Sequence, residues 1–429
     1  MSVSLPMIGP VVVVGGGHAG FQTVASLREN GFTGPLSLIS EENTLPYERP
    51  PLSKKLPAAA DDHTELRPAS FYDSHGVEVR VGEPAVAVDR RLRTVELGSG
   101  RRLDYDHLVL AVGAEPVPLP TLNRPLDGVL TLRTALDAAR IRARLSSRSR
   151  MVVVGGGFLG LEVAASAAQT GASVCVVEAA DRVLARVVSP LISRFLEQEH
   201  LSHGVTVLTE TLVVGLLDED GHVTGVRLAD GRELGADLVV VAIGVRPRTG
   251  LALAAGLAVA DDCGGGIVVD QYLRTTDPAI SAIGDCANFP GALPGGGRTR
   301  LESVQNAVDQ GRFVAARLMG VQPGAYDALP WFWTHQFDVK IQIAGLAGPE
   351  TELRLLGDPS AGRFSVARLV DDRLVSVESV NSPADHIAAR KLLGTAAVPS
   401  GARDLARPGF TLPSHAREAA EARRATAGQ

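Results

Sequence analysis

Two glycine-rich stretches point most directly to chemistry in this chain. Residues 11–20 read VVVVGGGHAG, and residues 151–160 read MVVVGGGFLG. Each places G-x-G-x-x-G after an apolar run and before an apolar-periodic segment, which predicts a buried strand, a tight turn and a helix start. Free N–H groups at such a helix start hold the pyrophosphate of a dinucleotide. Because the motif is repeated, the sequence predicts two nucleotide sites.

Each glycine of the motif has its own physical reason. Gly15 permits the tight turn, Gly17 lets a pyrophosphate approach the backbone, and Gly20 lets the helix pack closely on the strand. A single motif of this kind is weak evidence, and its repetition gives it weight. The same positions in the second turn are Gly155, Gly157 and Gly160.

An acidic residue follows the next predicted strand after each turn. Glu41 lies about 20 residues beyond the first motif, where a carboxylate binds an adenosine ribose. The alternatives for Glu41 are that its neighbour Glu42 takes this role or that it is a solvated turn acid. Glu178 holds the corresponding place after the second motif, where an acid binds a free 2′-hydroxyl and repels a 2′-phosphate. Glu178 therefore favours NADH over NADPH, although Arg182 and Arg186 lie nearby in the sequence.

Two further stretches carry charged residues at places suited to a cofactor. Residues 45–54 read LPYERPPLSK, and the prolines predict a stiff loop without a regular helix. Such a loop would hold Arg49 and Lys54 in fixed positions. Contact with a cofactor is favoured, and surface solvation is the alternative for Lys54. Residues 280–285 end a short strand in Gly-Asp, which places Asp285 at a sheet's carboxyl edge, where it can bind a ribityl hydroxyl. A cap on the next helix is the alternative for Asp285.

The elements around these residues repeat in the same order. Helices are predicted at 21–30 and 158–170, and β-meanders at 77–112 and 205–243. Each half ends in a small-residue turn followed by proline, the first of which marks a crossing between domains. An Arg-rich segment at 121–149 has helical spacing, typical of a solvated face, with an acidic docking partner as the alternative.

The C-terminal part is predicted to form a separate small α+β domain. Strands are expected at 339–343, 364–367 and 374–377, and a helix at 383–393. Trp331 and Trp333 indicate either core packing or a flat surface for stacking or for docking a partner. The charged tail after residue 412 shows no evident apolar face, which predicts disorder or a frayed helix.

Composition sets the broad class. The chain has 429 residues, 45% hydrophobic and 21% charged, with a net charge of −6. These values describe a soluble globular protein and give no argument for nucleic acid or membrane binding. The sequence shows no signal peptide, spanning segment or metal-ligand cluster. Cys175, Cys263 and Cys286 are widely spaced, which predicts a reduced, cytoplasmic setting.

The motifs together resemble a known family, the oxygenase-coupled ferredoxin reductases. The resemblance rests on the two glycine turns, Y-x-RPPLSK at 47–54, AIGD at 282–285, ESVQN at 302–306 and PWFW-x-x-Q at 330–336, and it covers about residues 9–412. These are FAD enzymes of the glutathione-reductase structural type that pass electrons from NADH to a [2Fe–2S] ferredoxin. The ferredoxin, a transient and acidic partner, serves a cytochrome P450 or a Rieske oxygenase. Rubredoxin reductases and apoptosis-inducing factor have a similar layout.

The resemblance implies roles for individual residues. Lys54 would lie near flavin N5 and pair with Glu162 as the catalytic pair, across the cleft between the two nucleotide sites. Arg49 would lie against the flavin or its phosphates, and Trp333 close to the isoalloxazine. FAD would be held by Gly15, Gly17, Gly20, Glu41 and Asp285, and NADH by Gly155, Gly157, Gly160 and Glu178. Further cofactor contacts are implied at His18, Ala19, Ala111, Gly113, Leu159, Gly244, Gly284 and Val304.

The implied fold is α/β, with two Rossmann-like three-layer nucleotide-binding domains and a small C-terminal α+β domain. The expected boundaries are 1–115 and 247–322 for FAD, 116–246 for NAD, 323–412 for the C-terminal domain and 413–429 for the tail. The sequence departs from the family at His335, where an acidic residue is usual, and at Val112, where threonine is more common. His335 is either a titrating group near the flavin edge or a tolerated neutral side chain.

The mechanism implied is hydride transfer, in which NADH reduces FAD and a ferredoxin takes the electrons singly. Cofactors supply this chemistry, so no nucleophile or metal is required. A rubredoxin reductase or an NADH oxidase-type flavoenzyme is the first alternative; disulfide, peroxide or NADH oxidases of this layout need a reactive cysteine near the flavin, and the 41–56 loop has none. A nucleotide-responsive binding protein like apoptosis-inducing factor is the second.

Overall fold

The computed structural model describes residues 8–56, 64–121, 123–262, 264–291, 296–321, 324–348, 350–394, 401–407 and 409–427. Cys263 and the expected boundary at residue 323 lie outside them. Within the described residues, every helix is too short or too polar to cross a lipid bilayer.

The chain forms two compact units. The first comprises Met1–Glu48, His63–Glu115 and Arg246–Pro330, and the second comprises Arg49–Asp62, Pro116–Val245 and Trp331–Gln429. The second unit thus contains the proline loop from Arg49 onward and the C-terminal region, together with the expected NAD domain. Two of the crossings between the units fall within β8 (Ala114–Pro116) and β17 (Val245–Pro247). The division into three domains stays a prediction.

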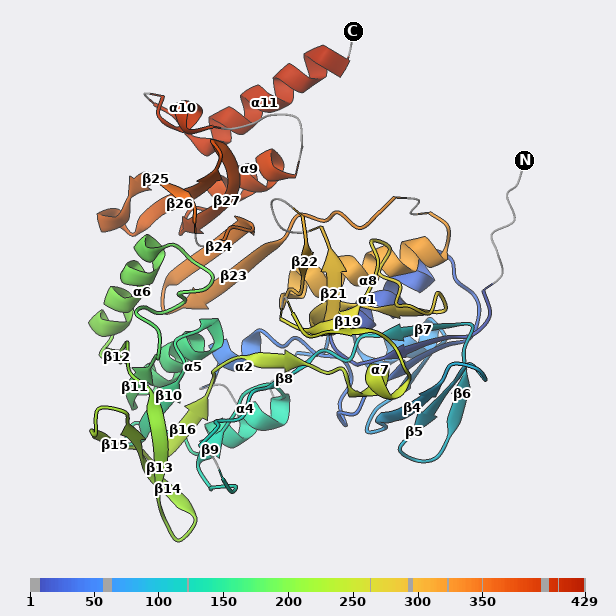
Figure 1. Ribbon diagram of the computed structural model, residues 1–429, viewed down its shortest axis with the longest axis horizontal. Helices are drawn as coiled ribbons and strands as arrows, with labels where there is room; N and C mark the ends of the chain where they lie inside the picture. Colours follow the sequence, from blue (N-terminus) through green and yellow to red (C-terminus); the bar gives the residue numbers. More distant parts are fainter. Residues whose placement is uncertain are drawn as a thin grey trace. The chain divides into compact units, whose positions relative to one another are not determined.

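The first unit is built on a five-stranded parallel sheet (Figure 1). The first glycine turn joins its central strand to α1 (His18–Glu29), which packs against α8 (Val304–Leu318). A Cβ on Gly311 of α8 would lie 2.8 Å from the Ala19 carbonyl oxygen. In spatial order, the strands are β20 (Ile280–Ala282), β7 (His107–Leu110), β1 (Val11–Val14), β2 (Leu36–Ile39) and β3 (Val77–Arg80). The helices are α1 (His18–Glu29), α3 (Ala69–Ser74), α7 (Gly250–Ala254) and α8 (Val304–Leu318), with η1 (Gly284–Cys286).

Two smaller sheets complete the first unit. One is antiparallel, formed by β4 (Ala85–Asp89), β5 (Thr94–Leu97) and β6 (Arg102–Asp104). The other contains β18 (Val259–Ala260), β19 (Gly266–Val268), β21 (Ala287–Pro290) and β22 (Arg298–Thr299).

The second unit repeats the parallel sheet around the second glycine turn. Its strands are β12 (Thr206–Leu208), β11 (Ser173–Val177), β10 (Arg150–Val154), β16 (Leu238–Val241) and β9 (Val129–Leu130). The helices are α2 (Pro51–Lys54), α4 (Ala135–Arg142), α5 (Phe158–Ala168) and α6 (Pro190–Ser202). An antiparallel sheet contains β13 (Val213–Glu219), β14 (His222–Leu228) and β15 (Glu233–Gly235). The predicted duplication is confirmed, because β1 and β10 hold the same central place.

The C-terminal region of the second unit is a five-stranded antiparallel sheet with helices. In spatial order, the strands are β23 (Trp331–Gln336), β24 (Val339–Gly345), β27 (Arg373–Val380), β26 (Arg363–Val370) and β25 (Glu352–Asp358). The helices are α9 (Pro383–Leu393), α10 (Ala402–Leu405) and α11 (Leu412–Ala427), with η2 (Pro359–Ala361). The predicted α+β character and the helix at 383–393 are confirmed.

Several local predictions are wrong. Residues 77–80 and 206–208 pair in parallel within the main sheets instead of joining meanders. The Arg-rich segment is not one helix, because α4 ends at Arg142 and Arg150 begins β10. The prolines of the 45–54 loop do not exclude a helix, since Pro50 is the N-cap and Pro51 the first residue of α2.

The predicted disordered or frayed tail is a helix with an apolar face. Leu412, Ala416 and Ala419 of α11 are buried against Ala389 and Leu392 of α9. Their spacing is that of one helix face. Alanine supplies most of this face, and so the segment looks uniformly polar and charged in the sequence.

A buried histidine makes the first unit sensitive to acid. Nε2 of His107 lies 2.9 Å from the Ser281 hydroxyl, and burial, followed by the nearby Arg317, lowers the pKa of His107 from 6.5 to about 3. Below pH 6.5, His107 therefore binds a proton in the unfolded chain but stays unprotonated in the folded chain. His107 should therefore lower the free energy of unfolding by about 1.4 kcal/mol per pH unit as the pH falls from 6.5 toward about 3. We expect His107→Gln to flatten this part of the acid dependence, measured as thermal midpoints against the parent from neutral to acidic pH. Parallel pH curves would contradict this.

Candidate nucleotide sites and the Lys54–Glu162 cluster

The two glycine turns have the same backbone geometry. Gly15 and Gly155 have φ of +124° and +108°, and a Cβ on them would lie 2.1 Å and 2.5 Å from the carbonyl oxygens of Ala111 and Ala242. A Cβ on Gly20 would lie 1.9 Å from the carbonyl oxygen of Gly15. The fold itself therefore requires these glycines, as the spacing predicts.

Gly157 is the glycine that the protein alone does not explain. Its φ is −77°, which any residue adopts, and a Cβ there would meet no atom of the described residues within 4 Å. The open space beside this backbone is what close approach of a pyrophosphate needs. The residues present therefore fit a bound dinucleotide at this turn.

Both helices that follow the turns present backbone N–H groups suited to phosphate. The N-cap residues are Gly17 for α1 and Gly157 for α5, and in the described structure neither supplies a side-chain cap. Helix starts of this kind leave N–H groups for an anion, supported by the positive end of the helix dipole. His18, Ala19 and Leu159 lie in these first turns.

The two strand-end carboxylates have different surroundings. Oε2 of Glu178 accepts a hydrogen bond from the Gly156 N–H at 2.6 Å, and Oε1 accepts one from the Ala180 N–H at 2.7 Å. Glu178 thus lies at the glycine turn, as a ribose-binding acid must. Glu41 forms an ion pair with Arg248, its side chain is 49% exposed, and its ribose role stays a prediction. Arg248 is a residue that sequence reasoning missed.

Asp285 lies on η1, directly after β20 of the parallel sheet. Gly284 has φ +72°, and its N–H donates to the Gln310 side chain at 2.7 Å. The next α-helix is capped by Ser303, whose hydroxyl accepts from the Asn306 N–H at 3.1 Å, and Val304 begins this helix. Asp285 is therefore not the cap of α8, and the ribityl role stays a prediction.

Lys54 and Glu162 form the predicted ion pair within the second unit. Nζ of Lys54 lies 2.6 Å from Oε1 of Glu162, and the two side chains are only 19% and 6% exposed. Glu162 also accepts hydrogen bonds from the hydroxyls of Ser53 at 2.5 Å and Thr334 at 2.6 Å. The carboxylate is thus held by α2, which precedes Glu162 in the sequence, and by β23, which follows it. Surface solvation of Lys54 is excluded.

Ser53, Thr334 and Ser166 were missed by sequence reasoning, although two of them lie inside quoted motifs. The Leu56 N–H donates to the Ser166 hydroxyl at 3.0 Å, which anchors the end of the proline loop on α5. Arg49 donates to the Arg133 carbonyl oxygen at 2.9 Å. Arg49 and Leu56, which both belong to the second unit, are therefore anchored within it.

The aromatic residues of β23 form a half-buried cluster. The ring centroids of Trp331 and Trp333 are 5.4 Å apart, and the Arg390 guanidinium lies 4.6 Å from the centroid of Trp331. Both tryptophans are partly exposed, so the stacking-surface alternative fits better than core packing. Partial desolvation, Lys340 and Lys54 hold the pKa of the exposed His335 below its usual value, which favours the neutral side chain.

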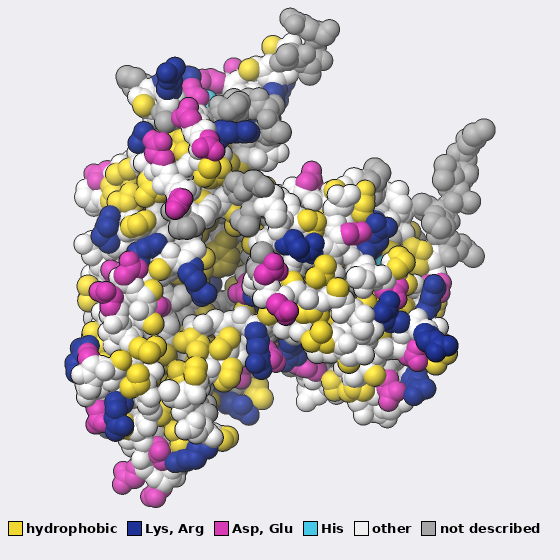
Figure 2. All heavy atoms as spheres, in the orientation of Figure 1, with side chains coloured by type: hydrophobic (Ala, Val, Ile, Leu, Met, Phe, Trp, Pro, Cys, Tyr) yellow, Lys and Arg dark blue, Asp and Glu magenta, His cyan; other side chains and the backbone are white. Residues whose placement is uncertain are grey.

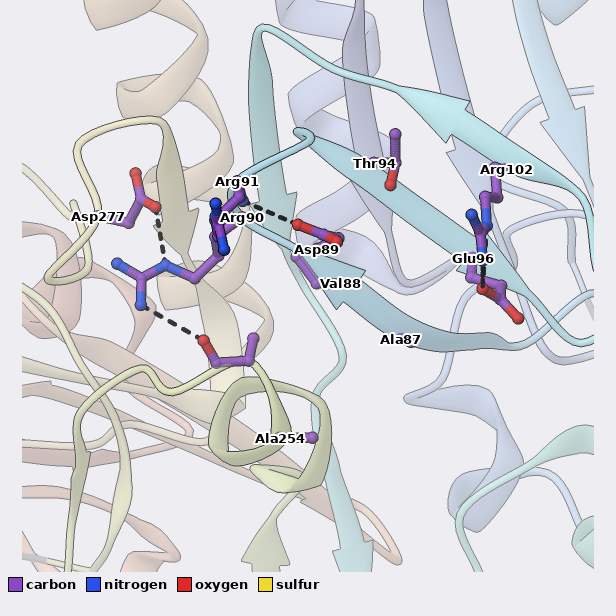
Figure 3. Close-up of a pocket in the computed structure, with 11 residues that line it drawn as sticks. Ala87, Val88, Asp89, Arg90, Arg91, Thr94, Glu96, Arg102, Ala254 and Asp277 are labelled. Atoms are coloured by element: carbon purple, nitrogen blue, oxygen red, sulfur yellow. Dashed lines mark hydrogen bonds and ion pairs between the residues drawn. The ribbon is translucent and has the colours of Figure 1, made fainter.

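A cavity of about 710 Å³ in the first unit is lined by none of the predicted site residues; Figure 3 shows the residues that line it. It is lined from β4, β5, β6 and α7, and four of its charged side chains form two ion pairs. Arg90 bonds Asp277 at 2.8 Å, and Arg102 bonds Glu96 at 3.0 Å. Basic and acidic side chains are also interspersed on the face seen in Figure 2. Among the described residues, no group of three or more His, Cys, Asp or Glu side chains is placed to hold a metal ion.

Comparison with known proteins defines the class. Residues 9–311 match the pyridine nucleotide-disulphide oxidoreductase family, and residues 331–416 match the reductase C-terminal family. The chain belongs to the pyridine nucleotide-disulphide oxidoreductases. This family of oxidoreductases uses FAD and NAD(H). The predicted fold class is thereby confirmed.

Particular relatives narrow the comparison. Rhodocoxin reductase of Rhodococcus erythropolis is 46% identical over 389 residues, covering 90% of this chain and 89% of the relative. Putidaredoxin reductase CamA of Pseudomonas putida is 38% identical over 390 residues, covering 89% and 91%. The crystal structure of the ferredoxin reductase for the CYP199A2 system from Rhodopseudomonas palustris superposes with a TM-score of 0.90 at 42% identity, covering 95% of this chain and 99% of that one. The covalent putidaredoxin reductase–putidaredoxin complex gives 0.90 at 37%, covering 96% and 99%.

Proposed function

We propose that this protein is an FAD-dependent NADH:ferredoxin reductase that passes electrons to a [2Fe–2S] ferredoxin of a cytochrome P450 or Rieske oxygenase system. The observation that carries the proposal is the pair of matching glycine turns in a chain whose described thiols are inert. Two dinucleotide sites allow electrons to enter from NADH, and the relatives named above include reductases of ferredoxins. When bound, FAD would supply the chemistry that links a two-electron donor, NADH, to a one-electron acceptor.

The chain's own residues bind and orient the two cofactors. Turn N–H groups at Gly17 and Gly157 would hold the pyrophosphates, Asp285 would bind the ribityl chain, and Glu178 would bind the NADH ribose. The ion pair with Glu162 fixes the direction of the Lys54 ammonium, so that it can stabilise negative charge that develops on a neighbouring group.

The thiols argue against a disulfide-reducing alternative. Cys286 is buried, and burial raises its pKa from 9.0 to about 11, as it does for Cys175. A reactive cysteine needs the opposite, a lowered pKa and access to solvent. Both cysteines are free thiols, which supports our further proposal of a reducing, cytoplasmic location.

A chain without cysteines separates these classes. Replacing Cys175, Cys263 and Cys286 together by alanine or serine should leave ferredoxin-dependent NADH oxidation within a few-fold of the parent rate. We would measure ferredoxin reduction optically under argon. A cysteine-free chain that binds flavin normally but has lost turnover would favour the disulfide or NADH oxidase type.

Glu178 should set the preference for NADH. Glu178→Gln removes the charge that favours a free 2′-hydroxyl, and we expect the ratio of NADH to NADPH affinity to fall by roughly 10- to 100-fold, the equivalent of one charged hydrogen bond. Dissociation constants would come from anaerobic titrations of the flavoprotein. Glu197→Gln is the matched control, because Glu197 also accepts a backbone N–H bond in this unit, from Val183 at 3.2 Å. An unchanged ratio in Glu178→Gln would place ribose recognition elsewhere.

A further inference from the structure

A continuous chain of side-chain hydrogen bonds joins a buried histidine to Glu162 within the second unit. Nε2 of His200 lies 2.9 Å from Oε1 of Gln336, and Nε2 of Gln336 lies 3.2 Å from Oγ1 of Thr334. Oγ1 of Thr334 lies 2.6 Å from Oε1 of Glu162. The chain runs from α6 through β23 to α5, and α5 and β23 lie side by side in Figure 1.

The carboxylate end fixes the direction of every bond in this chain. Glu162 is paired with Lys54 and, as an ionised carboxylate, can only accept, so the Thr334 hydroxyl must donate to it. That hydroxyl then accepts from Gln336, which must present its NH₂ group to Thr334 and its oxygen to His200. His200 must therefore carry its proton on Nε2. All donors point toward Glu162.

The burial of the chain makes this direction energetically important. His200, Gln336 and Thr334 are at most 1% exposed, and Glu162 is 5% exposed. In such surroundings, hydrogen bonds are strengthened and polarise one another when they are aligned. Nδ1 of His200 is buried without a partner among the described residues, as expected of a bare acceptor on an Nε2–H imidazole.

We propose that Thr334, Gln336 and His200 are positioning residues, a one-directional hydrogen-bond chain that orders and polarises Glu162 and thereby fixes Lys54 for the reaction. The proposal rests on the proposed function, because Lys54 acts there on the bound flavin. None of the three residues belongs to the glycine motifs or to the proline loop, and Gln336 and His200 do not contact the ion pair directly.

The first test reads the proton on His200 in the flavin-loaded protein. Two-bond ¹H–¹⁵N correlation spectra of ¹⁵N-histidine-labelled protein distinguish the two neutral tautomers, and a His200→Phe sample identifies the signals. We expect the Nε2–H tautomer alone in the unmodified protein. Thr334→Val frees Gln336 to turn over, so both tautomers should appear, whereas Thr334→Ser should restore the single form. An Nδ1–H form or a mixture in the unmodified protein would overturn the proposal, and this result requires no variant other than the assignment sample.

The second test reads the effect on the reacting centre. The limiting rate of flavin reduction by NADH, measured anaerobically by stopped flow, should fall roughly tenfold in Thr334→Val, the equivalent of one hydrogen bond to a charged group, with little change in half-saturating NADH. Thr334→Ser should recover the rate. Ser379→Ala is the matched control. The Ser379 hydroxyl is buried in the same sheet, 3.1 Å from that of Ser365, and takes no part in the hydrogen-bond chain.

The outcomes separate the two proposals. A Thr334→Ser rate as low as that of Thr334→Val, or a Thr334→Val rate equal to the parent's, would overturn the positioning role. Neither measurement uses ferredoxin. If ferredoxin is not reduced while NADH still reduces the flavin, the proposed function fails and the positioning role remains under test.

Discussion

Replacing Glu162 by leucine while Lys54 is kept should destabilise the second unit by roughly 3–5 kcal/mol. The reason is that a mostly buried ammonium loses the carboxylate that offsets its desolvation. The double variant Lys54→Met/Glu162→Leu should be more stable than Glu162→Leu, because no buried charge then lacks a partner. Urea unfolding followed by tryptophan fluorescence measures this, since both tryptophans, Trp331 and Trp333, belong to this unit.

Lys54→Met alone supplies the remaining corner of this cycle. It leaves Glu162 with the hydroxyls of Ser53 and Thr334, so we expect a cost smaller than that of Glu162→Leu. If the effects of the two single replacements simply add in the double variant, the pair contributes no coupling energy, and the account of Glu162 as the anchor of Lys54 is wrong.

The second large effect is expected at Glu378, on β27. Both carboxylate oxygens accept from the Ser189 N–H at 3.0 Å, one also accepts from the Ser189 hydroxyl at 2.6 Å, and Arg368 lies 3.1 Å away. Glu378 is 0% exposed, and Ser189 is the N-cap of α6. The carboxylate therefore joins the C-terminal sheet to the start of α6. Glu378→Leu should lower the free energy of unfolding by roughly 3–5 kcal/mol, because it leaves the Arg368 charge and the Ser189 donors without their partner.

Two comparisons make this prediction specific. Burial raises the pKa of Glu378 above its ordinary value, so its charge is not fully compensated, and the neutral Glu378→Gln should cost clearly less than Glu378→Leu. Glu352→Gln breaks the exposed Arg354 pair on β25 of the same sheet and should cost no more than about 1 kcal/mol. The same fluorescence-detected urea curves apply. Equal midpoints for Glu378→Leu and Glu352→Gln would show that this junction contributes little.

The parts of the fold that the sequence predicts well are those with a local signal. The runs of valine before Gly15 and Gly155, and the positive φ that these glycines permit, specify two strand–turn–helix units by themselves. Parallel pairing of residues 77–80 has no such signal, since a short apolar strand reads the same in a meander and in a parallel sheet. The alanine face of α11 was missed because alanine contributes little to hydrophobic periodicity.

Site residues could be predicted where a residue type stands at a fixed distance from a motif. They could not be predicted where a side chain contacts a residue far away in the sequence. Glu178 follows from its distance to a glycine turn, and the Lys54–Glu162 pair came from the family resemblance. Arg248 beside Glu41 and Thr334 beside Glu162 depend on tertiary contacts between segments far apart in the sequence. Nothing local distinguishes such an arginine or threonine from a solvated one.

The most direct test of the account is electron stoichiometry under anaerobic conditions. The purified flavoprotein would be given a limiting amount of NADH with an excess of an oxidised [2Fe–2S] ferredoxin, and both would be followed optically. We predict that each NADH reduces two ferredoxins, at a rate far above that of NADH oxidation without ferredoxin. NADH oxidation that proceeds equally with and without ferredoxin, and leaves the ferredoxin oxidised, would contradict the proposed function.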